Sequence, residues 1–143
     1  MAAPFSDIET KAELAMVRHL NSIGSSLAGV TIHAGVDPAN LPLPAIVCNV
    51  ASADEQIKFT GQYAVEVSIM VLDNADDTSA ATHRERIARV RDELSNDWIG
   101  ASLSGHVADF SAVGVVLQES SQAIEDRHWI ATIPVLVHCR PSD

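Results

Sequence analysis

The chain has 143 residues, 47% of them hydrophobic but only 4% aromatic, and its nine basic against 19 acidic residues give a formal net charge of -10. This length predicts one domain, residues 1–143, with a core of aliphatic side chains, a composition that favours sheets with helices packed on them. The acidity argues against a sequence-independent grip on nucleic acid, because phosphate binding depends on Lys and Arg, and no apolar run is long enough to cross a bilayer.

The first element predicted is a helix over residues 7–23. Ser6 and Glu9 have the spacing of a capping box, and Gly24 stands where a helix end favours a left-handed residue. One face of this helix is apolar and consists of Ile8, Ala12, Ala15, Met16, Leu20 and Ile23. His19 lies within that stripe, where a hydrogen-bonded core histidine is favoured over a ligand.

Leu14 and Val17 fall outside the apolar stripe of this helix. In a monomer we expect nothing to cover them. Two interpretations stay open: they are scattered exposed aliphatic side chains, or they contact a neighbouring subunit.

A short strand over residues 30–34 and a stiff loop over residues 35–44 follow. The loop holds three prolines, which prevent regular pairing, and we expect Leu41 and Leu43 to extend outward from it. Such a loop either docks on a partner or folds back over the sheet edge. Residues 45–51 alternate with Ile46, Cys48 and Val50 on one side and predict a second strand, whereas residues 52–58 are polar and typical of a turn.

Residues 62–72 give the clearest strand pattern, with Val65, Val67, Ile69 and Val71 on one face and Glu66 and Ser68 on the other. Met70 and Leu72 are apolar on the otherwise polar face. We therefore expect that end of the strand to be covered, by a loop of this chain or by another subunit.

An acidic turn over residues 73–79 leads into a helix over residues 79–96. The turn lacks the glycine and glutamate of an EF-hand loop, so solvation and the helix dipole explain its charges better than calcium. The helix is expected to bury Ala80, His83, Ile87, Val90 and Leu94. Its Arg84, Arg86, Arg89 and Arg91 alternate with acidic residues, which indicates a solvated, ion-paired face. Trp98 and Ile99 extend the buried stripe.

A small-residue loop is expected over residues 102–109, followed by a hairpin of residues 110–119 and 127–140 across a polar connection, residues 120–126. In the last strand Trp129, Ala131, Ile133, Val135, Val137 and Cys139 share one face. Pro134 has no N–H to donate, which places it on an edge strand or at a bulge and predicts a break in pairing. The result is an α+β fold, one mostly antiparallel or mixed sheet of about four to five strands with two helices, in the order α-β-β-β-α-β-β.

No catalytic or metal-binding motif is present. The sequence has no Gly-rich phosphate loop, nucleophile elbow, His-Glu-x-x-His or Cys-x-x-Cys pattern, and we expect no enzyme, cofactor or metal. His138 and Cys139 with Cys48 lack a fourth ligand, and adjacent strand residues point to opposite faces, so two reduced, buried cysteines are favoured. The N-terminus has no basic segment followed by an apolar one, so we expect no secretory signal and synthesis in the cytoplasm.

The order of these elements resembles that of the tail terminator, or tail completion, proteins of long-tailed bacteriophages. Three segments carry the resemblance: residues 61–72 (GQYAVEVSIMVL), 79–94 (SAATHRERIARVRDEL) and 127–137 (RHWIATIPVLV). It covers most of the chain and is a likeness of pattern and order. It implies a virion protein of the tail or neck that forms a ring, usually a hexamer, on the tail tube, ends tube growth and offers a surface to head-completion proteins.

The same resemblance implies no catalytic residue and no cofactor. The partners that it implies are other copies of the chain, the tail tube protein and connector proteins, with DNA passing through the ring without specific binding. An acidic lumen would repel phosphate and let DNA slide. Subunit and partner contacts are expected at Leu14, Val17, Leu41, Leu43, Phe59, Met70, Leu72 and Trp98. Two alternatives stay open: another neck or head-completion component, or a small cytosolic enzyme.

Overall fold

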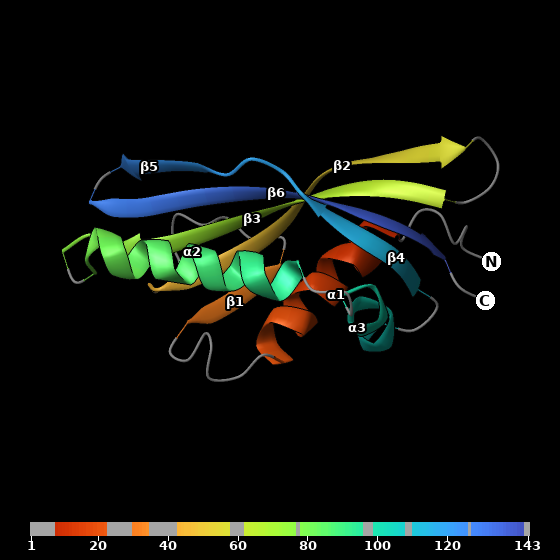
Figure 1. Cartoon of the computed structure of the whole chain (residues 1–143), viewed down its shortest axis with the longest axis horizontal. Coiled ribbons are helices and arrows are strands. Elements are labelled where there is room, and N and C mark those ends of the chain that lie inside the picture. Colours follow the sequence, from red (N-terminus) through yellow and green to blue (C-terminus); the bar gives the residue numbers. More distant parts are fainter. Residues whose placement is uncertain are drawn as a thin grey trace.

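One sheet with three helices on one of its faces makes up the described part of the chain (Figure 1). The computed structural model describes residues 8–22, 30–34, 43–57, 62–76, 78–95, 99–107, 110–125 and 127–141. The elements are α1 (Ile8–Ser22), β1 (Thr31–Ala34), β2 (Ala45–Ile57), β3 (Gln62–Asn74), α2 (Ala80–Leu94), α3 (Ile99–His106), β4 (Phe110–Leu117), β5 (Ser121–Glu125) and β6 (His128–Pro141). This confirms the expected α+β class, and it adds the helix α3 and the strand β5 to the expected order.

The strands are hydrogen-bonded in the order β1-β2-β3-β6-β4, and β5 also pairs with β6. Every pairing is antiparallel except that of β1 with β2, which is parallel. Since β3 occupies one edge of β6, β4 and β5 follow each other along the opposite edge, against residues 135–141 and 128–132. The sheet therefore has two outer borders, one formed by β1 and β2 and the other by β4 and β5.

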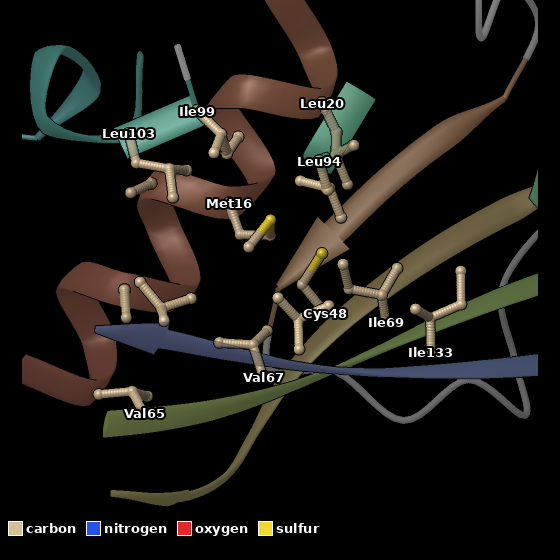
Figure 2. Close-up of a cluster of buried hydrophobic side chains, with 14 of the residues drawn as sticks. Met16, Leu20, Cys48, Val65, Val67, Ile69, Leu94, Ile99, Leu103 and Ile133 are labelled. Atoms are coloured by element: carbon tan, nitrogen blue, oxygen red, sulfur yellow. The ribbon is translucent and has the colours of Figure 1, made fainter. Parts of the chain in front are cut away.

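The side chains of β3 and β6 point alternately to the two faces of the sheet, and the apolar set on each strand determines which face carries the core. Val65, Val67, Ile69 and Val71 are fully buried, and the register places them beside Val137, Val135, Ile133 and Ala131 of β6. Figure 2 shows Met16 and Leu20 of α1 and Leu94 of α2 pointing at this face. The expected stripe of α1 is also confirmed, because Ile8, Ala12, Ala15, Met16 and Leu20 are at most 1% exposed. Aliphatic side chains thus build most of this core, as the composition predicts, and Phe110 is its one aromatic member among the described buried residues.

The helix α2 begins where its sequence predicts. The Oγ of Ser79 accepts a hydrogen bond from the backbone N–H of Thr82 at 3.2 Å, which satisfies one of the free donors of the first turn. His83, Ile87, Val90 and Leu94 are buried as expected, whereas Ala80 is half-buried. The cap residues expected for the first helix, Ser6 and Gly24, lie outside the described residues.

Three segments expected to be irregular are regular structure, so those expectations are wrong. Residues 52–57 continue β2, because β3 is long enough to pair with them as far as Ile57 and its ladder overrides their polar composition. Residues 102–106 belong to α3, in which Leu103 is buried in the core despite the low helix propensity of two glycines. Residues 121–125 form β5, because Arg127, with a φ of 64°, turns the chain back at once into β6.

Pro134 lies in β6, between β3 and the β4–β5 border, so its expected place on an edge strand is wrong. The expected break in pairing is confirmed on one side only. Against β3 the register runs unbroken through Ser68↔Pro134, whereas on the other side β4 ends opposite Val135 and β5 begins opposite Thr132. On the β4–β5 side, the carbonyl of Pro134 accepts a hydrogen bond from the N–H of Gln118 at 2.9 Å. The N–H that proline lacks would point to the same side.

Candidate functional site

Three ionisable side chains, Asp73, His83 and Arg86, meet beneath the sheet where β3 ends and α2 begins. Asp73, the last core-facing residue of β3, is fully buried. Its Oδ2 lies 2.6 Å from Nδ1 of His83, and its Oδ1 forms an ion pair with the guanidinium of Arg86. His83 and Arg86 stand three residues apart on α2, so both reach the same carboxylate from one helix face. The cluster fastens the first turns of α2 to the end of β3.

Burial keeps His83 neutral in this cluster. The guanidinium of Arg86 stays charged and already balances the carboxylate of Asp73. Loss of solvation on burial lowers the pKa of His83, and the positive charge of Arg84 lowers it further. Neutral His83 donates its Nδ1–H to Asp73, which leaves Nε2 buried and without a hydrogen-bond partner among the described residues. With its side chain 2% exposed, His83 is a structural anchor that a substrate in solvent does not reach.

Trp129 of β6 packs against the same cluster. Its ring stacks on that of His83 with centroids 6.0 Å apart, and its Nε1–H donates to the carbonyl of Thr78 at 2.9 Å. Thr78 belongs to the turn before α2, so Trp129 joins that turn to β6 while Asp73 joins the helix to β3. The sequence signals for the cluster are the core-facing position of residue 73 and the buried stripe that contains His83. The interpretation of residue 73 as part of a solvated turn is therefore wrong.

His19 links all three helices. Its Nε2 donates to the backbone carbonyl of Glu93 at 3.1 Å, so its Nδ1 is the acceptor for the hydroxyl of Ser102 at 2.7 Å. Burial lowers the pKa of His19, and the Glu93 carbonyl opposes this shift in part. The neighbouring Arg18 donates to the carbonyl of His106 at 2.5 Å and ties α1 to the end of α3. The expectation that His19 is a hydrogen-bonded core residue is confirmed.

The two cysteines lie in the core as thiols. Cys48 and Cys139 are buried and free, and burial raises the pKa of Cys139 to about 12 and that of Cys48 further still. His138 is half-buried on the opposite face of β6. Within the described ranges, no three His, Cys, Asp or Glu side chains come together in a way that could hold a metal ion. No helix in these ranges has the length and apolar character needed to cross a membrane.

Exposed apolar side chains stand along the β4–β5 border, on both faces of the sheet, and were not foreseen in the sequence. Val113 is 77% exposed, Ile124 is 56% exposed and Val116 is 49% exposed. All three belong to the outer strands on one side of β6, and residues 110–124 include one charged residue, Glu119. Protein interfaces are depleted of charge at their centres, so this border is the surface of the described chain best suited to contact another protein.

A bulge in β4 turns Val113 outward, and α3 holds that bulge. The register shifts between Ala112 and Gly114. The Oγ of Ser104 accepts from the Ala112 N–H at 2.8 Å, and a Cβ added to Gly100 would stand 2.9 Å from the carbonyl oxygen of Val113. The first half of the outer edge of β4 is therefore protected by a helix and a bulge, which are two common protections of edge strands.

Five of the contact residues expected from the sequence lie in the described part of the chain, and they differ in burial. Leu14 and Val17 are half-buried and pack against the core of the same chain, so the expectation that a monomer leaves them uncovered is wrong. Leu72 is 4% exposed and Met70 is half-buried, which confirms that this end of β3 is covered. Leu72 is covered by residues of its own chain. Leu43 is also half-buried. The other three, Leu41, Phe59 and Trp98, lie outside the described residues.

Comparison with known proteins gives matches among solved structures. No family model matches the chain, and no curated protein matches it. Among solved structures, the chain is similar to a chain of the structure described as "Virion of native gene transfer agent (GTA) particle". The TM-score is 0.63 at 18% sequence identity, and the match covers 90% of this chain and 93% of that chain. At this identity the likeness shows a shared fold.

Proposed function

We propose that this chain is a structural protein of a phage-like virion, and that it acts as a tail terminator. The observation that carries the proposal is the fold match to a chain of a gene transfer agent virion, which extends over nearly the whole of both chains. The order of helices and strands, which by itself resembles that of phage tail terminators, supports the same conclusion. Fold alone does not determine function, so the proposal also needs support from the surface of the chain.

The surface of this chain fits an assembly role. The clusters of titratable side chains around Asp73 and around His19 hold helices in place, and Asp73, His83 and His19 are buried. The most exposed large apolar side chains lie on one border of the sheet. In our proposal residues 1–143 form one domain, copies of the chain assemble into a ring, six in number, and the ring caps the tail tube in the neck region of the virion.

The proposed partners are other copies of this chain, the tail tube protein and the head-completion or connector proteins. Tube growth ends because the ring occupies the surface on which the next tube ring would assemble. The net charge of -10 suits a lumen through which DNA passes without specific binding, since carboxylates repel phosphate. Leu14, Val17, Leu43 and Met70 remain proposed contacts, through the parts of each side chain that the monomer leaves exposed.

Assembly of tail tubes in vitro tests the proposed function. Purified tail tube protein polymerises with and without this chain, and electron microscopy records tube length and tube ends. A terminator gives shorter tubes that carry one extra ring at a single end. A neck or head-completion component gives unchanged tubes and co-purifies with connector rings instead. Binding to neither tubes nor connectors contradicts a role at the head-tail joint.

A further inference from the structure

The structure has two sheet borders whose backbone groups lack a strand partner among the described residues. On one side, β1 pairs with residues 45–48 of β2 only, and the N–H of Val50 donates to the carboxylate of Glu13 at 3.0 Å. Residues 51–57, here called the β2 arm, continue beyond that point with β3 as their one described neighbour. On the other side lie residues 114–117 of β4 and all of β5, here called the apolar edge.

The apolar edge carries few of the features that keep edge strands from pairing with other chains. Charged residues, prolines, bulges and covering helices serve this purpose in natural sheets. The bulge and α3 protect β4 only as far as Gly114. Beyond it, residues 114–125 contain no proline and two charged residues, Glu119 and Glu125, and Val116 and Ile124 are exposed by about half. An unprotected edge with exposed apolar side chains is suited to receive a strand from another protein.

We infer that the β2 arm of a second copy of this chain pairs with the apolar edge, and this inference rests on the proposed ring function. Backbone complementarity supports this choice of partner, because each copy offers one open border of each kind. The arm contains Asp54 and Glu55, and residues 114–127 contain Glu119, Glu125 and Asp126 as well as Arg127, so charge does not select the partner and the choice rests on the open borders.

Length and symmetry fit the same contact. Residues 52–55, the stretch of the arm between its two register shifts, extend about 13 Å, and the β4 and β5 parts of the apolar edge extend about 13 Å and about 17 Å, so this stretch can pair with either part. A two-fold contact of one apolar edge with another would leave both arms unpaired and would stop at a dimer. The contact of arm with edge joins different surfaces, so it repeats from copy to copy and forms the proposed ring when the rotation between copies closes.

Charge substitutions on the apolar edge, with native mass spectrometry as the readout, test the contact. Val116→Glu and Ile124→Glu place carboxylates where the acidic arm of the neighbour would lie, and we expect both variants to lose the ring and remain monomeric. Ala88→Glu on the exposed face of α2 is the matched control and keeps the ring. Because Val116 is half-exposed, Val116→Glu should unfold at the same temperature as the unchanged chain. A ring that persists in both edge variants overturns the inference.

Hydrogen exchange identifies which segment occupies the edge. In the ring, we expect amides of residues 51–57 and 114–124 to exchange at least roughly tenfold more slowly than in the monomeric Val116→Glu variant. Protection of residues 114–124 without residues 51–57 means that the occupant is another segment or another protein, and it overturns the inference. A ring without either protection overturns the inference and leaves the proposed function standing. A chain that stays monomeric and binds no tail tube contradicts the proposed function itself.

Discussion

Replacement of Asp73 by Ala should destabilise the protein strongly. The carboxylate of Asp73 is fully buried and is the partner of both His83, at 2.6 Å, and Arg86. Removal of one partner of a buried ion pair costs about 3 to 5 kcal/mol, because the remaining charge stays unpaired. Arg86 is 24% exposed and can turn toward water, which places the loss near the lower limit, at about 3 kcal/mol. His83 cannot turn away in this manner, since its side chain is 2% exposed.

Urea unfolding followed by circular dichroism measures this loss. With a slope of about 2 kcal/mol per molar urea, a loss of about 3 kcal/mol lowers the midpoint by about 1.5 M without a change in slope. Asp76→Ala is the matched control, because Asp76 is 61% exposed and stands 3.7 Å from the exposed Arg127. The control should change the free energy of unfolding by less than about 0.5 kcal/mol. Equal midpoints for Asp73→Ala and Asp76→Ala would refute the claim that the cluster fastens α2 to β3.

Two further predictions concern pH and a pair of glycines. Burial lowers the pKa of His83 and of His19 below about 6.5, the value in the unfolded chain, so the unfolded chain takes up a proton on each histidine more readily than the folded chain. The free energy of unfolding should therefore be highest above about pH 6.5 and should fall as the pH drops below that value. A urea midpoint that stays constant from about pH 7.5 to about pH 5 contradicts this sign. Gly100→Ala brings a Cβ within 2.9 Å of the Val113 carbonyl oxygen and should lower the free energy of unfolding by about 1 to 3 kcal/mol. The Cβ of Gly105→Ala meets nothing within 4 Å, so this variant should stabilise α3 by up to about 1 kcal/mol. Thermal melting points that shift in the same direction for both variants count against the close approach of α3 to β4.

Those parts of the fold that depend on side-chain periodicity could be predicted from the sequence. The alternation of residues 65–71 and 131–139 predicts two strands and their buried face, and the stripe from Ile8 to Leu20 predicts the buried face of α1. Ser79 marks the start of α2 because a capping hydroxyl acts locally. In these segments the hydrophobic pattern and the local backbone preference agree, and such agreement makes a sequence-based prediction secure.

Elements whose stability comes from distant partners could not be predicted in the same way. Residues 52–57 and 121–125 lack the regular apolar alternation of a core strand, and they are strands because β3 and β6 supply the ladder. Gly100 and Ser104 resemble loop residues, yet α3 needs them to approach the bulge of β4 closely. The exposed valines of β4 were missed for a related reason. Val113 and Val116 resemble core residues of a strand until the sheet order places β4 at its border.

Native mass spectrometry of the purified chain, over a range of concentrations and with tail tubes added, tests the central claim most directly. The proposed function predicts a closed oligomer of a single size, six copies, and a ring of that size at one end of each tube in negative-stain images. A chain that remains monomeric at every concentration and leaves the tube ends bare would contradict the account.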